Sequence, residues 1–196
     1  MLPVAANKKA LAMTINRKIP KYFTLDEVRQ ILNPLQKEKN YRAWFLFLFL
    51  VRTGARVSEA LRVRVADIDF SNKVISIQTM KRPGNPVRSV PIKDDFIGAI
   101  GEYIAREGLL RENKLFKYNR VTAYLYVRNL CHAAGIMDDR AHPHTCRHTF
   151  AIINLAQGVP VTVVQEWLGH ANILNTLIYT RILAQHSRGF AEQVNW

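Results

Sequence analysis

Apolar residues recur along most of this chain with the spacing of α-helices. Segment 41–52 is apolar on almost every side, which predicts a helix buried at the centre of the domain, and Gly54 follows as a left-handed cap. Thr24 and Glu27 have the spacing of a capping box, so a helix is expected from there to about Leu32. Further helices are expected over 94–107, 122–134, 145–157 and 161–168.

One short region alternates apolar and polar positions with period two, as strands do. Segments 74–79 and 87–90 show this alternation, and the Pro-Gly-Asn-Pro sequence at 83–86 predicts a hairpin turn between them. A short helix is expected around Ser58 to Leu61. The fold class expected is therefore α+β, mainly helical, with a small antiparallel β-sheet or hairpin.

Charge narrows the classes of partner. Lys and Arg number 28 against 15 Asp and Glu, a formal net charge of +13, which favours a polyanion such as nucleic acid over an anionic membrane surface. Solubility alone remains an alternative explanation of this charge. The apolar run 44–51 is too short to span a bilayer, and the N-terminus lacks the pattern of a signal peptide. Cys131 and Cys146 lack metal-site spacing, so we expect reduced thiols, a cytoplasmic protein and no metal.

Composition divides the chain into three expected parts. Residues 1–21 form a basic arm without acidic residues, which could follow a phosphate backbone, although an unstructured tail fits the same composition. Residues 22–182 are the folded domain, and 183–196 form a short amphipathic tail. The basic residues of the arm are Lys8, Lys9, Arg17, Lys18 and Lys21.

His144 and Arg147 form the first candidate site. Their spacing of three places both on one face at a helix start, where backbone amides and the helix dipole favour an anion such as phosphate. A capping histidine beside a solvated arginine is the alternative. Tyr179 taken alone is equally compatible with a core residue whose hydroxyl reaches the rim.

With its motifs in this order, the chain resembles the catalytic domain of the tyrosine recombinases, the phage integrase family. The resemblance runs from about Leu25 to Arg181. The stretches that carry it are Thr53–Leu61 with Arg56 and Glu59, Lys81 at the end of the first strand, His144–Ala151 with Arg147, Leu168–His170, and Tyr179. An ordered set of this kind is far more specific than any single motif.

The resemblance implies DNA strand exchange by transesterification without metal, ATP or another cofactor. Tyr179 would attack a backbone phosphate, which leaves a 3′-phosphotyrosyl bond and a free 5′-hydroxyl. The implied catalytic residues are Arg56, Lys81, His144, Arg147, His170 and Tyr179. A nicking-closing topoisomerase and a non-catalytic DNA-binding regulator on the same fold are the two alternatives.

Each of these side chains has an expected task. Arg56 and Arg147 suit a bidentate clamp on the non-bridging oxygens, whose charge grows in the transition state. Lys81 would protonate the leaving 5′-oxygen, with Lys73, Arg82 and Arg88 as neighbouring competitors for that role. His144 could accept the tyrosine proton, and His170 could hydrogen-bond the phosphate. Glu59 would orient Arg56, His148 is expected to pack or support the site, and His142 is expected in a loop.

The partner expected is double-stranded DNA, with a tetramer on DNA, a monomer or weak oligomer when free, and accessory proteins as a further possibility. The DNA-contacting residues expected are Lys8, Lys9, Arg17, Lys18, Lys21, Arg82 and Arg88. Most members of the family carry a separate N-terminal DNA-clamping domain, and Met1 followed by a basic arm favours a naturally short form over a fragment. Segment 183–196 would dock on a neighbouring subunit or pack on its own domain.

Overall fold

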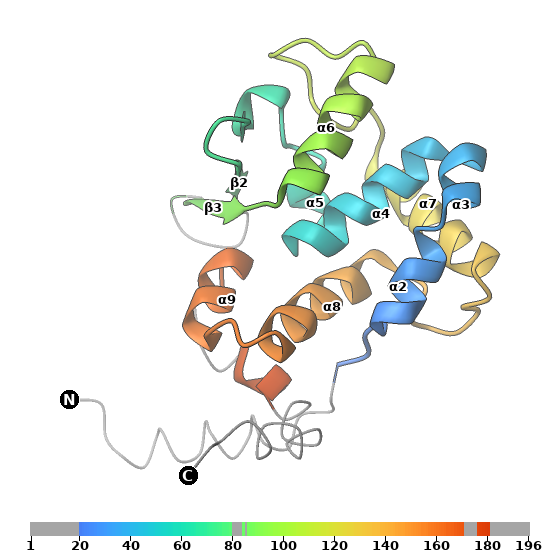
Figure 1. The fold of residues 1–196 in the computed structure, drawn as a ribbon, viewed down its shortest axis with the longest axis vertical. Helices are drawn as coiled ribbons and strands as arrows, with labels where there is room; N and C mark the ends of the chain where they lie inside the picture. The colour runs from blue at the N-terminus through green and yellow to red at the C-terminus, as the bar shows by residue number, and fades with distance from the viewer. Residues whose placement is uncertain (1–19, 80–83, 85, 171–175, 181–196) are drawn as a thin grey trace.

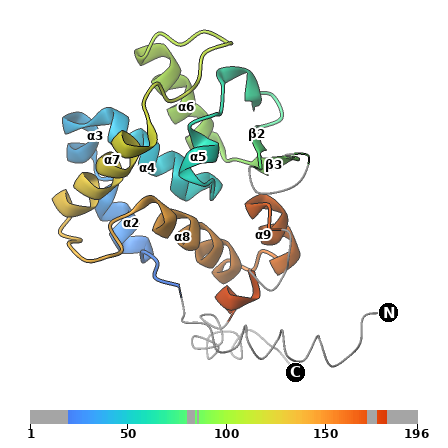
Figure 2. The same ribbon diagram turned by 180° about the vertical axis from the view of Figure 1, so that it is seen from behind.

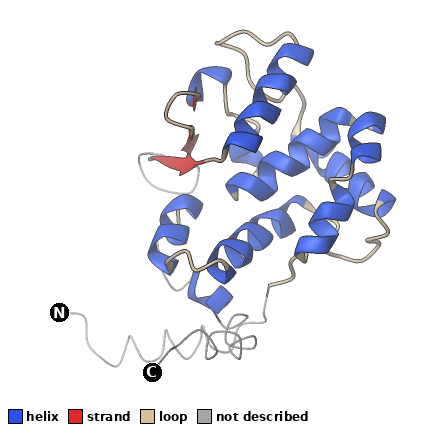
Figure 3. Ribbon diagram, viewed as in Figure 1, coloured by secondary structure: helices blue, strands red, loops and turns tan. Residues whose placement is uncertain are grey.

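The computed structural model describes residues 20–79, 84, 86–170 and 176–180. Helices dominate this part of the chain, and one small antiparallel sheet lies at an edge of the molecule (Figures 1 and 3). The expected α+β, mainly helical fold is thus confirmed. Among the described residues, no helix combines the length and apolar character needed to cross a membrane.

Helix α2 (Leu25–Ile31) begins with the expected capping box. The Thr24 hydroxyl accepts the amide of Glu27, and the Glu27 carboxylate accepts the amide of Thr24. Two orphan donors of the first turn are satisfied in this way. Helix α3 (Pro34–Lys39), which sequence analysis does not predict, follows with Asn33 as its cap.

Helix α4 (Tyr41–Thr53) runs through the centre of the domain and is buried along most of its length. It packs against α7 (Arg120–Ala133) and α8 (Pro143–Ala156), and the views from both sides show α8 alongside it (Figures 1 and 2). Gly54 ends α4 at φ 62°, where a Cβ atom would lie 2.5 Å from the Phe150 ring. Both the backbone and the packing therefore require glycine there.

The sheet has the strand order β1-β2-β3, all antiparallel. The expected hairpin corresponds to β2 (Val74–Gln78) and β3 (Val87–Pro91), with Ile75 opposite Val90. Strand β1 (Ile68–Asp69) adds an edge that the sequence does not predict. The short elements α5 (Val57–Ala60) and η1 (Val65–Asp67) lead into the sheet, and α6 (Asp94–Arg106) leads away from it.

Helix α9 (Val161–Leu168) packs against both α8 and β3, so it joins the helical part of the domain to the sheet. Residues 176–180 form a further helical segment. Most of the expected arm, Lys81 and the expected tail lie outside the described residues.

Candidate active site

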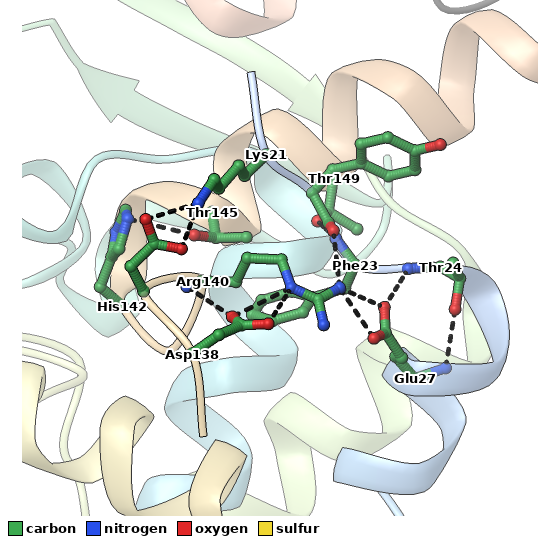
Figure 4. A network of polar contacts seen from close by, with 11 residues as sticks. Lys21, Phe23, Thr24, Glu27, Asp138, Arg140, His142, Thr145 and Thr149 are labelled. Carbon is green, nitrogen blue, oxygen red and sulfur yellow. Dashed lines mark hydrogen bonds and ion pairs between the residues drawn. The ribbon is translucent and has the colours of Figure 1, made fainter. Parts of the chain in front are cut away.

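The N-terminus of α8 is held by a network of polar contacts (Figure 4). The ring of His142 accepts the amide of His144 through Nδ1 at 3.2 Å, so His142 is the cap of this helix. Burial lowers the pKa of His142, which keeps the ring uncharged and able to accept. His142 lies outside the helix, directly before Pro143, as expected of a loop residue, and it also caps the helix; α8 begins at Pro143 rather than at Thr145.

The same network ties α8 to the N-terminal part of the domain. Arg140 forms ion pairs with Glu27 of α2 and with Asp138 in the loop before α8. The amide of Phe23 donates to the Thr149 hydroxyl at 2.9 Å (Figure 4). The contacts of Glu27 on α2 and of Phe23 just before it thus fix the position of α8. This helix carries three of the candidate site residues.

Arg147 is buried in the middle of the site, with only 1% of its surface exposed. Its Nη1 donates to the carbonyl of Gly54 at 2.7 Å, and its Nη2 donates to the carbonyl of Leu168 at 2.6 Å. These carbonyls belong to the C-terminal ends of α4 and α9, where unpaired carbonyls and the helix dipoles favour a cation. Burial and the charge of Arg56 lower the pKa of Arg147 to about 9, so it remains charged at neutral pH. The alternative of a solvated arginine is wrong.

Glu59 is the carboxylate on which three arginines converge. Its Oε1 accepts Nη1 of Arg56 at 2.8 Å, and its Oε2 accepts the amide of Arg56 and Nη2 of Arg88 at 2.7 Å. Nη1 of Arg147 lies 4.0 Å from the same carboxylate. Burial opposes ionisation of Glu59, but the charges and hydrogen bonds of the arginines outweigh it and lower the pKa of Glu59.

Arg88 occupies a position that differs from the sequence expectation. It was expected to contact DNA, yet it is 6% exposed and lies inside the site on β3. Its Nε donates to the carbonyl of Trp167, its Nη1 to the Thr79 hydroxyl and its Nη2 to Glu59. Arg88 therefore joins the sheet to the end of α9 and to Glu59. The burial of Arg88 could be predicted from the alternation of the strand, because Arg88 and Val90 point to the same, buried face of β3.

His170 is placed by the way in which α9 ends. The amide of Gly169 donates to the carbonyl of Glu166 and that of His170 to Gln165, which is the bonding pattern of a Schellman motif. Gly169 supplies the left-handed residue at φ 65°. Nδ1 of His170 lies 2.9 Å from the Thr176 hydroxyl, and burial followed by the charge of Arg147 lowers its pKa to about 3. The ring is therefore neutral at physiological pH.

Tyr179 lies in the helical segment 176–180 and is 3% exposed. Its hydroxyl lies 2.9 Å from Nδ1 of His148, and the two ring centroids are 5.7 Å apart. Burial raises the pKa of Tyr179, while the charges of Arg147 and Arg56 act in the opposite direction. The structure thus brings together Arg56, Arg147 and Tyr179, which lie far apart in the sequence.

Of the remaining candidates, the structure describes His144 and Lys21. His144 is exposed on the first turn of α8, with its ring 4.7 Å from that of His148. Lys21 pairs with Asp139 at the surface. Lys8, Lys9, Arg17, Lys18, Lys81 and Arg82 lie outside the described residues. Within the described ranges, no group of three or more His, Cys, Asp or Glu side chains is arranged to hold a metal ion.

Solved structures share this fold. A crystal structure of XerA recombinase superposes with a TM-score of 0.75 at 24% identity, over 92% of this chain and 66% of that one. The catalytic domain of bacteriophage HP1 integrase gives a TM-score of 0.66 at 23% identity, over 82% of this chain and 87% of that domain. A post-cleavage complex of XerH site-specific recombinase with palindromic difH substrate gives 0.73 at 25% identity. The fold is that of tyrosine recombinase catalytic domains.

Sequence comparison agrees with the fold. A tyrosine recombinase XerA from Pyrococcus furiosus is 31% identical over 190 residues, and a tyrosine recombinase from Pseudothermotoga lettingae is 35% identical over 175. The family model described as the Phage integrase family matches residues 21–186. The chain therefore belongs to the phage integrase family, as its motifs indicated. The aligned parts are 92% and 87% of this chain but only 64% and 59% of the two relatives, so it spans less than two thirds of their length.

Proposed function

We propose that the protein is a site-specific DNA recombinase that cleaves and rejoins DNA strands through Tyr179. The observation that carries the proposal is that Arg56 and Arg147 both face the buried carboxylate of Glu59, while their charges act on the hydroxyl of Tyr179. A phenol beside two guanidinium groups suits nucleophilic attack on a phosphodiester, because the cations offset the charge that the transition state develops.

The step proposed is a transesterification in which bond number is conserved. The Tyr179 oxygen loses its proton and bonds to phosphorus, while the bond from phosphorus to the 5′-oxygen breaks. The leaving 5′-oxygen accepts a proton, and we assign the donation of that proton to Lys81. The 5′-hydroxyl of another strand then attacks the phosphotyrosyl bond and reverses the step, so no external energy source is needed.

Arg147 and Arg56 would hold the non-bridging oxygens of the phosphate. The two carbonyl contacts of Arg147 use two of its five N–H donors, so the planar group is oriented by the fold before DNA arrives. Glu59 holds Arg56 in the same way through Nη1. This preorganisation is what makes such donors effective at a developing charge. His170 would hydrogen-bond the phosphate through its ring.

Double-stranded DNA is the proposed partner, in the cytoplasm. We further propose that a tetramer forms on DNA, with accessory proteins deciding its outcome, and that the free protein is a monomer or weak oligomer. Relatives named tyrosine recombinases support strand exchange over relaxation alone. The assembled arginines and tyrosine support catalysis over a purely regulatory role.

Covalent trapping tests this proposal. Supercoiled plasmid that carries the DNA flanking the gene is incubated with the protein in EDTA without ATP, and the reaction is stopped with detergent. Wild type should leave protein covalently bound to DNA, and Tyr179→Phe should leave none. Tyr22→Phe is the matched control, because Tyr22 packs against the same apolar cluster as Tyr179. Equal adduct from Tyr179→Phe and wild type, or clear DNA binding without any adduct, would reject the proposal.

A further inference from the structure

We propose that His148 takes the proton of Tyr179 when the phenol attacks the phosphate. This inference rests on the proposed function and deepens it, because it assigns a task that sequence analysis gave to His144. The contact that points to it is the 2.9 Å distance between Nδ1 of His148 and the Tyr179 hydroxyl. This distance is within hydrogen-bond reach, which is the geometric requirement for a general base.

The fold holds this pair in place from both sides. His148 lies one turn after His144 on the same face of α8, and the two rings pack edge to face. Tyr179 is 3% exposed and packs among apolar side chains that include Phe150 and Leu168. The hydroxyl is therefore presented to His148 in a site that water reaches poorly.

The charges around His148 favour its neutral form. Burial, followed by the charges of His144, Arg147 and His142, lowers the pKa of His148 to about 3. From the other elements, the phenol of Tyr179 lies beside the ring of His148, and His170 interacts with it electrostatically. A neutral imidazole has one nitrogen that accepts, and the proposal requires Nδ1 of His148 to be that nitrogen, with the hydrogen on Nε2.

DNA binding would change this balance in the direction that the reaction needs. A phosphodiester anion between Arg56 and Arg147 adds a negative charge close to His148 and partly cancels the effect of the arginines. The affinity of His148 for a proton therefore rises when substrate is bound. At the same moment the Tyr179 oxygen begins to bond to phosphorus and its affinity for the proton falls. The proton moves from the tyrosine oxygen to Nδ1, and it returns when the phosphotyrosyl bond is reversed.

The resting tautomer is the first test, and it needs no DNA. Long-range ¹H–¹⁵N correlation of the imidazole groups should show His148 neutral at neutral pH, with Nδ1 unprotonated and with an Nδ1 shift that changes in Tyr179→Phe. A proton on Nδ1 in the free protein would overturn the proposal, because that nitrogen could not accept another. This measurement stands even if the protein forms no covalent adduct, which would be a failure of the proposed function instead.

The second test separates proton transfer from positioning. His148→Asn keeps an acceptor oxygen near the place of Nδ1 but cannot take a proton, so it should lower the single-turnover cleavage rate about 100-fold at neutral pH. The rate should then rise about tenfold per pH unit, because phenolate must form before attack. The substrate is a nicked duplex that carries the cleavage site mapped in the plasmid experiment.

Two histidine variants provide the comparison. His144→Asn should lower the rate and keep the pH profile of the wild type, and His132→Asn on α7 should match wild type. A rate for His148→Asn within a few-fold of wild type, or a loss that does not change with pH, would show that His148 only positions Tyr179. A pH profile of the predicted shape in His144→Asn instead would assign the proton to His144.

Discussion

Glu59 contributes both to the stability of the fold and to the arrangement of the arginines in the candidate active site. Its carboxylate is buried and faces Arg56, Arg88 and Arg147, so neutralising it leaves buried cations without their counter-charge. Glu59→Gln should therefore lower the free energy of unfolding by about 3 kcal/mol, measured by urea denaturation at neutral pH. Glu102→Gln is the control, since Glu102 pairs with Lys37 at the surface and its loss should cost no more than about 1 kcal/mol.

The pH dependence of this effect has a definite sign. The pKa of Glu59 is lower in the folded than in the unfolded protein, so its contribution is fully present above the unfolded value of 4.5. The difference between wild type and Glu59→Gln should shrink as pH falls below that value and through the folded pKa. A difference that stays constant across this range would show that folding does not lower the pKa of Glu59.

The planar guanidinium group of Arg147 is required for its contacts, in addition to its charge. Lysine has one nitrogen, which cannot reach both the Gly54 and the Leu168 carbonyls in the geometry that Nη1 and Nη2 provide. Arg147→Lys should reduce single-turnover cleavage by about 100-fold or more, because the phosphate loses an oriented donor. Arg29→Lys, which changes an exposed ion pair on α2, should cleave at the wild-type rate. Near-normal cleavage by Arg147→Lys would show that charge alone suffices.

At the residue scale, the motif positions were visible in the sequence but their partners were not. His144, Arg147 and Tyr179 could be identified from spacing and resemblance. That Arg88 is buried against Glu59, and that His148 faces Tyr179, depends on how β3, α8 and the segment 176–180 meet. Contacts between residues 29 and 31 positions apart leave no local pattern in one sequence.

The position of His170 depends on how helix α9 ends. Gly169 has φ 65°, and a Cβ atom there would lie 2.9 Å from the Thr79 hydroxyl and 3.1 Å from Cδ of Arg88. Gly158 at the end of α8 has φ 84° with nothing within 4 Å of such an atom. Gly158→Ala should therefore lower the free energy of unfolding by about 1–2 kcal/mol, the cost of a left-handed backbone for a residue with a Cβ atom. Gly169→Ala should lower it by more, because its Cβ atom would also meet neighbouring side chains.

Urea unfolding of both variants measures this difference, and cleavage assays measure its consequence for His170. Gly169→Ala should also slow cleavage, because Arg88 and the Schellman motif would have to move together. Gly158→Ala should leave cleavage unchanged. Equal loss of stability in the two variants would mean that the contact with Arg88 is loose enough to yield.

Elements with strong local signals were predicted well. The buried helix α4, its Gly54 cap, the capping box of α2 and the β2-β3 hairpin follow from periodicity and turn chemistry. Helix α3 has six residues and β1 has two, which is too short for a periodic pattern to emerge. The true start of α8 was missed because its cap is a histidine, a residue outside the usual set of capping side chains.

For the whole molecule, the net charge of +13 predicts that the proposed binding to DNA depends on salt. Binding that releases counterions weakens linearly on a log–log plot of affinity against salt. We expect weak binding by the isolated protein that falls about tenfold or more over a roughly fourfold rise in salt, measured by fluorescence anisotropy with a labelled duplex. An affinity that does not change with salt would contradict an electrostatic mode of binding.

The residue that carries the DNA in the covalent complex can be identified directly. The covalent complex is digested with nuclease and protease, and the peptide that retains a nucleotide is sequenced by tandem mass spectrometry. We expect a nucleotide joined through its 3′-phosphate to Tyr179. A nucleotide on another residue, such as Tyr124 or Tyr126, or one joined through its 5′-phosphate, would contradict it.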